Sequence, residues 1–478
     1  MRREFPSLRR AAPARLAALF ASALLLSPPA APPRAQGRKD EQGQKQQQKQ
    51  QGALERDRAR GKEILGIIRG RIEENYYDPN YHGVDLKARF KTAEERIKNA
   101  ASNGEIFSII AGLLDGFNDS HLYFIPPNRT ARVEYGWLMQ MIGDKCYVVD
   151  LKRGSDAAKN GLKIGDEVWS IDGYEPTREN LWKIRYSYYT LKPRPGMRVV
   201  VQEPGGAQHE VVTLAKLTTA ADFFRAARDK KKVPEPPAFR DVGGELFVWK
   251  MESFRIDDKA LDEMMRRALP FKAMILDLRG NGGGYEKALL RLLGYFFDRE
   301  VKLGDIKRRK EVKPLVAKPR GAGAYFAGRL VVLIDSNSGS AAELFARTVQ
   351  LEKRATLLGD RSSGHVMRSR LYGESTFRGS WDFATYSFFA VSVTDADIRM
   401  ADGGSLEHVG VTPDELLLPT GADLLAGRDP VLSRAAAILG FKLDPQQAGA
   451  LFPRAARDEE GDDDKDEEDP PDKDKRDK

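Results

Sequence analysis

The sequence predicts a multidomain α+β protein, because its hydrophobic pattern changes twice along the chain. Its 478 residues allow roughly two to four domains of ordinary size, each with its own core. Apolar residues recur at helical spacing in 61–130, form short strand-like runs in 131–216, and alternate between strand and helix patterns in 217–440. We therefore expect an N-terminal helical domain, a small β domain and a layered α/β core, in that order.

The N-terminus has the three parts of a secretory signal peptide. Five arginines precede an apolar run at 16–26, and a Pro- and Ala-rich stretch continues to Gln36. We therefore expect residues 1–36 to be removed and the protein to be exported, to the periplasm or the extracellular space. No apolar run reaches the ~20 residues that cross a bilayer, so we expect no membrane span in the mature chain.

Most of the net positive charge of the chain lies in its N-terminal segment. The formal net charge is +8, with an isoelectric point near 9.2, which by itself suggests nucleic acid or an anionic surface. Six Arg and one Glu lie in 1–36, so the mature chain keeps +3. Residues 37–60 are rich in Gln and Lys, and 441–478 in Asp, Glu and Lys, so we expect both to be disordered. Nucleic acid is therefore not an expected partner.

Cysteine and histidine usage limits the chemistry further. Cys146 is the one cysteine, which excludes an intrachain disulfide framework and a cysteine-based zinc cluster. No spacing of His, Cys and carboxylates is typical of a metal site, so we expect neither a metal nor another cofactor.

The segment after the helical domain carries a distinctive string. Residues 157–173 read AAKNGLKIGDEVWSIDG, with a Gly-Leu bend, a Gly-Asp turn into a strand and an Asp-Gly hairpin signal. This string resembles a PDZ domain, which we assign to 131–216. The resemblance implies that backbone N–H groups of one loop bind a peptide carboxylate while the peptide adds a strand to the sheet edge. By position, that loop consists of Tyr135, Gly136, Trp137 and Leu138.

Two glycine- or serine-rich stretches of the core each follow a predicted strand and open a predicted helix. The first, DLRGNGGG at 277–284, lacks the Lys-Ser/Thr of a P-loop and the spacing of a Rossmann fingerprint. A structural tight turn and a nest of N–H groups that holds an oxyanion both fit it. The second, DSNSGSAAE at 335–343, places Ser340 three residues before Glu343. This spacing is a helix capping box, and the same helix start also suits a nucleophile.

The order of these segments, followed by the string GDRSSGH, resembles the tail-specific or carboxy-terminal processing serine proteases. The resemblance covers about residues 60–420. It implies a protease core of the ClpP/crotonase type in 217–440. It also implies that Ser340 is the nucleophile and that Gly283 and the N–H of Ala341 form the oxyanion hole.

The general base is where the sequence departs from that family. A lysine is usual after the nucleophile, and this chain has His365 at that place. The tricorn-type peptidases are similar at the points of departure, since they use a Ser-His pair from the helical domain and a Glu in an E-N-x-G-V-x-P-D string. Here the pair is Ser120 and His121, and the matching string begins at Glu407. His121 is then the expected base, oriented by Ser120 and Glu407; His365 is the alternative base, and a lost activity is the third outcome.

These features together predict an exported serine endopeptidase. The resemblance implies that it docks protein substrates with accessible C-termini on its PDZ domain and hydrolyses their peptide bonds through an acyl-enzyme at Ser340. The alternative is a non-catalytic PDZ-containing protein that binds peptides or apolar ligands on a protease fold, which the absent lysine supports. The sequence leaves the oligomeric state open.

Overall fold

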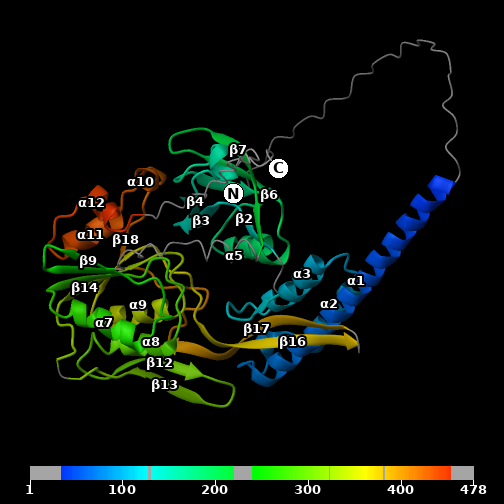
Figure 1. Ribbon diagram of the computed structural model, residues 1–478. Coiled ribbons are helices and arrows are strands. Elements are labelled where there is room, and N and C mark those ends of the chain that lie inside the picture. The colour runs from blue at the N-terminus through cyan, green and yellow to red at the C-terminus, as the bar shows by residue number, and fades with distance from the viewer. Residues whose placement is uncertain (1–33, 128–130, 220–238, 322, 381–382, 454–478) are drawn as a thin grey trace, which may run out of the picture. The chain divides into compact units, whose positions relative to one another are not determined.

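The computed structural model describes residues 34–127, 131–219, 239–321, 323–380 and 383–453 (Figure 1). The chain divides into two compact units, Met1–Ala53 and Leu54–Lys478. The described part of the first unit is helical and belongs to α1 (Arg34–Asn75). The expected signal peptide lies almost wholly outside the described residues. None of the described helices combines the length and the apolar character that crossing a bilayer requires.

Residues 37–60 form part of α1, where we expect a disordered linker from the sequence. The segment consists largely of Gln, Lys, Glu, Arg and Ala, which all have high helix propensity. Its composition argues only against a buried core, because a polar segment can be helical without an apolar stripe. Residues 37–60 are therefore helical rather than disordered, and they are polar as expected.

Helices form the N-terminal core of the second unit. They are the C-terminal half of α1, α2 (Leu86–Asn99) and α3 (Asn103–Asp115), with a short 3-10 turn, η1 (Tyr81–Gly83), before α2. Asp85 and Ser102 cap α2 and α3, since each side chain accepts a hydrogen bond from an N–H of the first turn. The buried side chains are mostly Ile, Leu and Phe at helical spacing, as the sequence pattern predicts.

Residues 137–214 form a five-stranded antiparallel sheet with the order β3-β4-β5-β6-β7. Its strands are β3 (Trp137–Ile142), β4 (Lys145–Leu151), β5 (Glu167–Ile171), β6 (Gly196–Gln202) and β7 (Gln208–Leu214). The helical elements between them are α4 (Asp156–Lys159), α5 (Leu181–Tyr186) and η2 (Ser187–Leu191), and β2 (Ala131–Glu134) pairs with β8 (Lys216–Thr219). Because β3 ends this order, one of its edges is unpaired within the sheet.

The second half of the chain contains the layered α/β arrangement that the alternation of patterns predicts. Its sheet has the order β18-β15-β14-β11-β10-β9, and every pair is parallel except β10 with β9. The strands are β9 (Phe239–Val242), β10 (Leu246–Lys250), β11 (Ala273–Asp277), β14 (Arg329–Ile334), β15 (Thr356–Gly359) and β18 (Glu415–Leu416). Side chains of α7 (Asp258–Ala268), α8 (Glu286–Leu293) and α9 (Ala341–Leu351) share a core with one face of the sheet. Those of α11 (Pro430–Ile438) and α12 (Pro445–Leu451) share a core with the other face.

This topology brings the loops that carry candidate catalytic residues to one edge of the sheet. The strands β11, β14 and β15 are neighbours and parallel, so their carboxyl ends lie at the same edge of the sheet. The strings DLRGNGGG, DSNSGSAAE and GDRSSGH begin at or directly after these ends. In open α/β sheets this edge is the usual place for a ligand site.

A long hairpin, β16 (Met367–Ser380) and β17 (Phe383–Met400), connects this core to the helices (Figure 1). β17 also pairs with β1 (Tyr123–Ile125) and with β12 (Val301–Lys307), which in turn pairs with β13 (Val312–Ala317). Phe389, Val391 and Val393 of β17 are buried in the core formed by the helices. The segment just before β1 is thereby fixed against the α/β part of the chain.

The expected C-terminal tail begins later than the sequence suggests. Residues 441–453 are described, and after α10 (Gly421–Ala426) and α11 they continue into α12. Ala448 is buried, and Leu451 and Phe452 pack on the same core as α11. These apolar side chains explain why the segment folds. The remainder of the expected tail, 454–478, lies outside the described residues.

Candidate active site

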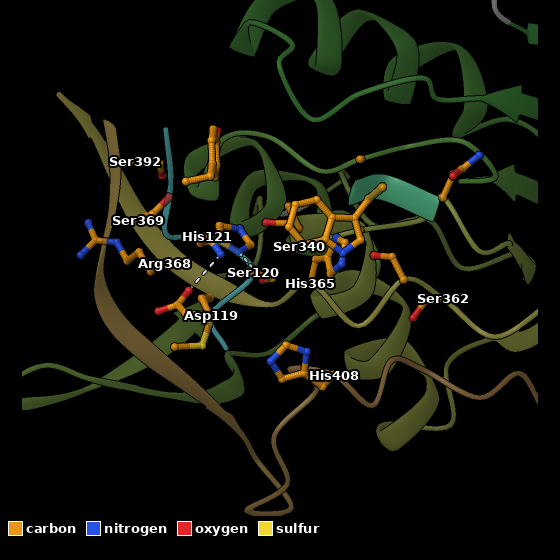
Figure 2. A pocket seen from close by; sticks show the side chains of 18 of the residues that line it. Asp119, Ser120, His121, Ser340, Ser362, His365, Arg368, Ser369, Ser392 and His408 are labelled. Atoms are coloured by element: carbon orange, nitrogen blue, oxygen red, sulfur yellow. Dashed lines mark hydrogen bonds between the residues drawn. The ribbon is translucent and has the colours of Figure 1, made fainter. Parts of the chain in front are cut away.

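One cavity of about 1040 Å³ lies where the loops after β11, β14 and β15 meet the loop before β1. Ser120, His121, Ser340 and His365 all line it, and Figure 2 shows them grouped around it. These residues come from three segments that are far apart in the sequence. The structure therefore brings the predicted nucleophile and both candidate bases to one place.

Ser340 lies at the start of α9 with a backbone conformation that few L-residues adopt. Its φ is +54° and its ψ is −117°. Its N–H lies 2.9 Å from Oε2 of Glu343 and 3.0 Å from the carbonyl oxygen of His365. Its own carbonyl accepts from the N–H groups of Glu343 and Leu344. These bonds maintain a strained turn, and strain of this kind clusters at functional sites.

Glu343 connects the Ser340 turn to the loop that follows β15. Its buried carboxylate accepts hydrogen bonds from the backbone N–H groups of Ser340, Gly364 and His365 and from the hydroxyls of Ser362 and Ser363. Burial raises the pKa of Glu343 to about 7, and the hydrogen bonds act in the opposite direction. Glu343, which the sequence predicts only as part of a helix cap, therefore also holds the loop that carries His365.

Ser120 joins Glu407 to His121. Its Oγ lies 2.9 Å from Oε2 of Glu407 and 2.9 Å from Nδ1 of His121. An ionised carboxylate can only accept, so Ser120 donates its proton to Glu407 and accepts one from Nδ1–H of His121. This tautomer leaves Nε2 of His121 as a proton acceptor. Glu407 also accepts the N–H groups of Ser120 and Val366, each at 2.9 Å.

The charge state of His121 suits proton acceptance. Burial of the ring lowers its pKa from the usual 6.5 to about 4, while the negative charge of Asp119 acts in the opposite direction. The ring is therefore neutral near pH 7. Within the described residues, no hydrogen bond joins His121 to Ser340.

Asp119 is a residue that the sequence analysis misses. Its Oδ1 accepts the N–H of His121 at 2.9 Å and the hydroxyl of Thr394 at 2.8 Å, and its Oδ2 accepts the hydroxyl of Tyr76 at 2.9 Å. Figure 2 shows its carboxylate beside His121. The sequence signal that could have found it is an Asp two residues before a candidate base, a spacing that favours an Asx turn. Asp119 therefore fixes the backbone of the predicted base.

The other histidines of the cavity differ from His121 in their contacts. His365 is tied down through its backbone, and its imidazole makes no hydrogen bond among the described residues. Burial lowers its pKa, as does the neighbouring His408. His408, which the sequence analysis also misses, places Nε2 2.9 Å from the carbonyl oxygen of Asn118 and 3.4 Å from Oε1 of Glu407.

No group of three or more His, Cys, Asp or Glu in the described ranges is arranged to hold a metal ion.

The predicted oxyanion donors, Gly283 and Ala341, have different hydrogen-bond states. The N–H of Gly283 donates to Oδ1 of Asn281 at 2.9 Å, so it is engaged inside its own turn. The N–H of Ala341 has no acceptor in the described part of the chain. Gly283 instead makes a close approach: its φ is +93°, and an added Cβ would lie 2.7 Å from Cβ of Ser340. The adjacent Gly282 is exposed and lines the cavity.

The predicted peptide-binding loop lies outside this cavity. Tyr135 and Gly136 line a separate, smaller cavity of about 200 Å³, together with Lys152 and Ser155. Trp137 and Leu138 begin β3, and the rings of Tyr135 and Trp137 are buried in the core of the small sheet. Further along β3, the side-chain amide of Gln140 donates to Asp335, and Ser336 donates to the carbonyl of Met141. β3 therefore extends from the smaller cavity to the turn that carries Ser340.

Sequence comparison finds relatives that are named as peptidases or proteases. Residues 247–417 match the profile described as Peptidase family S41. The chain is 22% identical over 370 residues to the chloroplastic C-terminal processing peptidase of Tetradesmus obliquus, covering 73% of this chain and 75% of that protein. It is 26% identical over 358 residues to the tail-specific protease of Haemophilus influenzae, covering 69% of this chain and 48% of that protein. The chain thus spans about half the length of the second relative.

Among solved structures, mature CPAF complexed with lactacystin is similar, with a TM-score of 0.58 at 15% identity, covering 77% of this chain and 95% of that chain. At that identity the likeness concerns the fold alone. The family match and the sequence relatives confirm the predicted resemblance to tail-specific and carboxy-terminal processing proteases.

Proposed function

We propose that this chain, of which residues 247–417 match Peptidase family S41, is an exported endopeptidase that cleaves protein substrates through an acyl-enzyme at Ser340. The observation that carries the proposal is the hydrogen-bonded series Glu407–Ser120–His121, which lies at the same cavity as the strained Ser340. Serine hydrolysis needs a nucleophile, an oriented base and donors for an oxyanion, and the cavity offers candidates for each.

In the proposed acylation step, Nε2 of His121 takes the proton of Ser340 while Oγ attacks the scissile carbonyl carbon. The negative charge that develops on the carbonyl oxygen is stabilised by the N–H of Ala341 and by the N-terminal end of α9. His121 then gives its proton to the leaving amine, and the C–N bond breaks. In deacylation, His121 accepts a proton from the attacking water and returns it to Ser340.

Glu407 and Ser120 act on His121 rather than on the substrate. Glu407 holds the hydroxyl of Ser120, which holds Nδ1–H and so keeps the tautomer with a free Nε2. During proton transfer the imidazolium is stabilised through the same two bonds. His365 remains the alternative base, since it lines the same cavity and occupies the position of the family's lysine.

We further propose that residues 131–216 are a PDZ domain that receives the C-terminal region of a substrate. The edge of β3 that is unpaired within the sheet can accept an added strand. The loop Tyr135–Gly136 borders a cavity whose lining has three lysines and two carboxylates, with Lys152 paired to Glu134 at 3.5 Å. The predicted signal peptide at 1–36 supports a periplasmic or extracellular location.

A non-catalytic binding protein on the same fold is the second candidate. It is favoured by the missing hydrogen bond between His121 and Ser340 in the described residues and by the engaged N–H of Gly283. A fluorophosphonate probe separates the two, because only an activated serine is phosphonylated. We expect labelling of Ser340; intact peptide binding with an unlabelled Ser340 would favour the binder.

The direct test is the substitution Ser340→Ala in the mature protein. We expect hydrolysis of an unstructured polypeptide to fall by at least about 10³-fold, because no nucleophile remains. The rate is measured from new N-termini released over time. Equal activity in the variant and the wild type would refute the assignment.

A further inference from the structure

The cavity that contains Ser340 also carries an excess of unpaired positive charge. Arg185, Arg255 and Arg361 line it, and all three are exposed. Within the described residues none of them makes an ion pair. Arginine presents a planar fork of donors that matches a carboxylate, so an unpaired arginine at a cleft is available to a substrate.

The other charges of the lining are largely neutralised by partners in the chain. Arg178 pairs with Asp360 at 2.5 Å, and Lys183 pairs with Asp115 at 2.9 Å. Arg368, labelled in Figure 2, pairs with Glu286 at 3.3 Å and Asp395 at 3.4 Å. Asp119 is occupied by hydrogen bonds to Tyr76, Thr394 and the loop backbone.

Glu179 is the remaining carboxylate of the lining, and it interacts electrostatically with Arg361 and Arg178. It offsets part of the charge of Arg361. Arg185 and Arg255 have no comparable neighbour among the lining carboxylates of the described chain. The side chains that line the cavity comprise six cations and four carboxylates, a net charge of +2. Arg178 and Arg368 also pair with Asp360 and Asp395 outside the lining, so the cations left without a carboxylate partner in the described chain are Arg185 and Arg255.

The three arginines come from different elements around Ser340. Arg255 lies against the turn with Gly284, since an added Cβ on Gly284 would lie 2.5 Å from the Arg255 nitrogen. Arg361 directly precedes Ser362, whose hydroxyl donates to Glu343. Arg185 is on α5, beside Leu181 and Trp182 of the same lining. An extended peptide in a cavity of this size would therefore meet arginines from three different segments of the chain.

We infer that the cleft selects polypeptide segments with Asp or Glu close to the scissile bond. This inference rests on the proposed function and specifies its substrate class. Clefts lined by one sign of charge concentrate field lines and attract the opposite charge. Carboxylates near the cleaved bond would pair with Arg255, Arg361 or Arg185 and improve both capture and placement.

The test measures binding, so it does not depend on turnover. The full chain with Ser340→Ala is titrated with two fluorescent peptides of equal length that carry Glu or Gln at the same positions. Both have an amidated C-terminus, which removes the carboxylate that the smaller cavity would bind. At low salt we expect the Glu peptide to bind about 5- to 30-fold more tightly, as two or three weak exposed pairs allow. The difference should shrink at high salt, because screening weakens exposed pairs.

Substitution of the arginines shows whether the cleft causes the preference. Arg255→Gln combined with Arg361→Gln should reduce the preference for the Glu peptide about 3- to 10-fold. The matched control is Arg153→Gln, an exposed arginine outside the lining, which should keep the preference.

Equal affinities for the two peptides, or a preference that survives the double substitution, would overturn the inference. Failure of the proposed function would be seen separately, as wild-type protein that cleaves neither peptide and whose Ser340 stays unlabelled. A preference for the Glu peptide in that case would still support an acidic ligand at this cleft.

Discussion

At the scale of single residues, the orientation of His121 depends on a carboxylate on either side of it. Asp119 holds its backbone, and Glu407 acts on its ring through Ser120. Ser120, His121 and Glu407 can be predicted from the sequence because their strings resemble those of tricorn-type peptidases. Asp119 cannot, because two of its partners, Tyr76 and Thr394, lie 43 and 275 residues away, and no local pattern reveals such contacts.

The two candidate bases can be separated by matched substitutions. We expect His121→Ala to reduce the rate of acylation by at least about 10²-fold, because general base catalysis contributes about 10²- to 10⁴-fold. His365→Ala should have a smaller effect, since its ring has no orienting hydrogen bond among the described residues. Acylation is measured as the rate of fluorophosphonate labelling of Ser340. Loss of labelling in the His365 variant alone would reassign the base.

The pH dependence follows from the low pKa of His121. Burial places this pKa near 4, so the base stays neutral well below the usual 6.5. We expect kcat/KM to remain high as the pH falls through 6.5 and to decline only at more acidic pH. An inflection near 6.5 in the acidic limb would contradict the buried state of the ring.

The same shift predicts the effect of pH on folding. The folded state binds the His121 proton less readily than the unfolded state, so its contribution to stability is present above about 6.5 and is lost as the pH falls toward 4. As the pH falls from about 6.5 to 4, the free energy of unfolding of His121→Asn should therefore decrease less than that of the wild type. The measurement is Tm against pH for both proteins.

At the scale of elements, the turns at the carboxyl ends of β11 and β14 pack closely against each other because Gly283 has no side chain. Their strand–turn–helix pattern is readable from DLRGNGGG and DSNSGSAAE, and the structure has both. The sequence does not predict the hairpin β16–β17, because its pairing is decided by partners such as β1 and β12 that are distant in sequence. It does not predict the helix at 37–60 either, because low apolar content is also typical of disordered segments, although the helix propensity of the segment is high.

The close approach of Gly283 to Ser340 can be tested by substitution. A side chain there would have φ at +93° and would place Cβ 2.7 Å from Cβ of Ser340. We expect Gly283→Ala to destabilise the protein by about 1–3 kcal/mol and to displace Ser340. The control is Gly282→Ala, where nothing lies within 4 Å of the added Cβ. Equal Tm values for the two variants would mean that the turn relaxes freely.

At the scale of the second unit, the helices and the α/β part are joined by shared contacts rather than by a linker alone. Residues of β17 complete the core of the helices, and Thr394 of the same strand donates to Asp119. The candidate site therefore depends on contacts between segments that each have a readable local pattern. Sequence periodicity predicts such segments well, but it does not determine how their surfaces meet.

Thr394 allows this dependence to be tested. Thr394→Val keeps the shape but removes a donor from Asp119, which should cost about 1–3 kcal/mol of stability and lower kcat/KM by loosening His121. The control is Thr213→Val, because the buried Oγ1 of Thr213 has no hydrogen-bond partner among the residues that the structure describes. That control should be neutral or stabilising. Thermal unfolding and peptide hydrolysis of both variants decide the matter, and identical behaviour would show that the Thr394 contact is dispensable.

Cys146 gives the molecule a practical property. It is the single cysteine of the chain, it is buried on β4, and burial raises the pKa of its thiol to about 12. A thiol in that state reacts poorly with maleimides. A new cysteine at the exposed Val409, on the rim of the large cavity, would therefore take a fluorophore selectively without replacement of the native one. The natural sequence is thus already suited to reporting substrate entry by fluorescence.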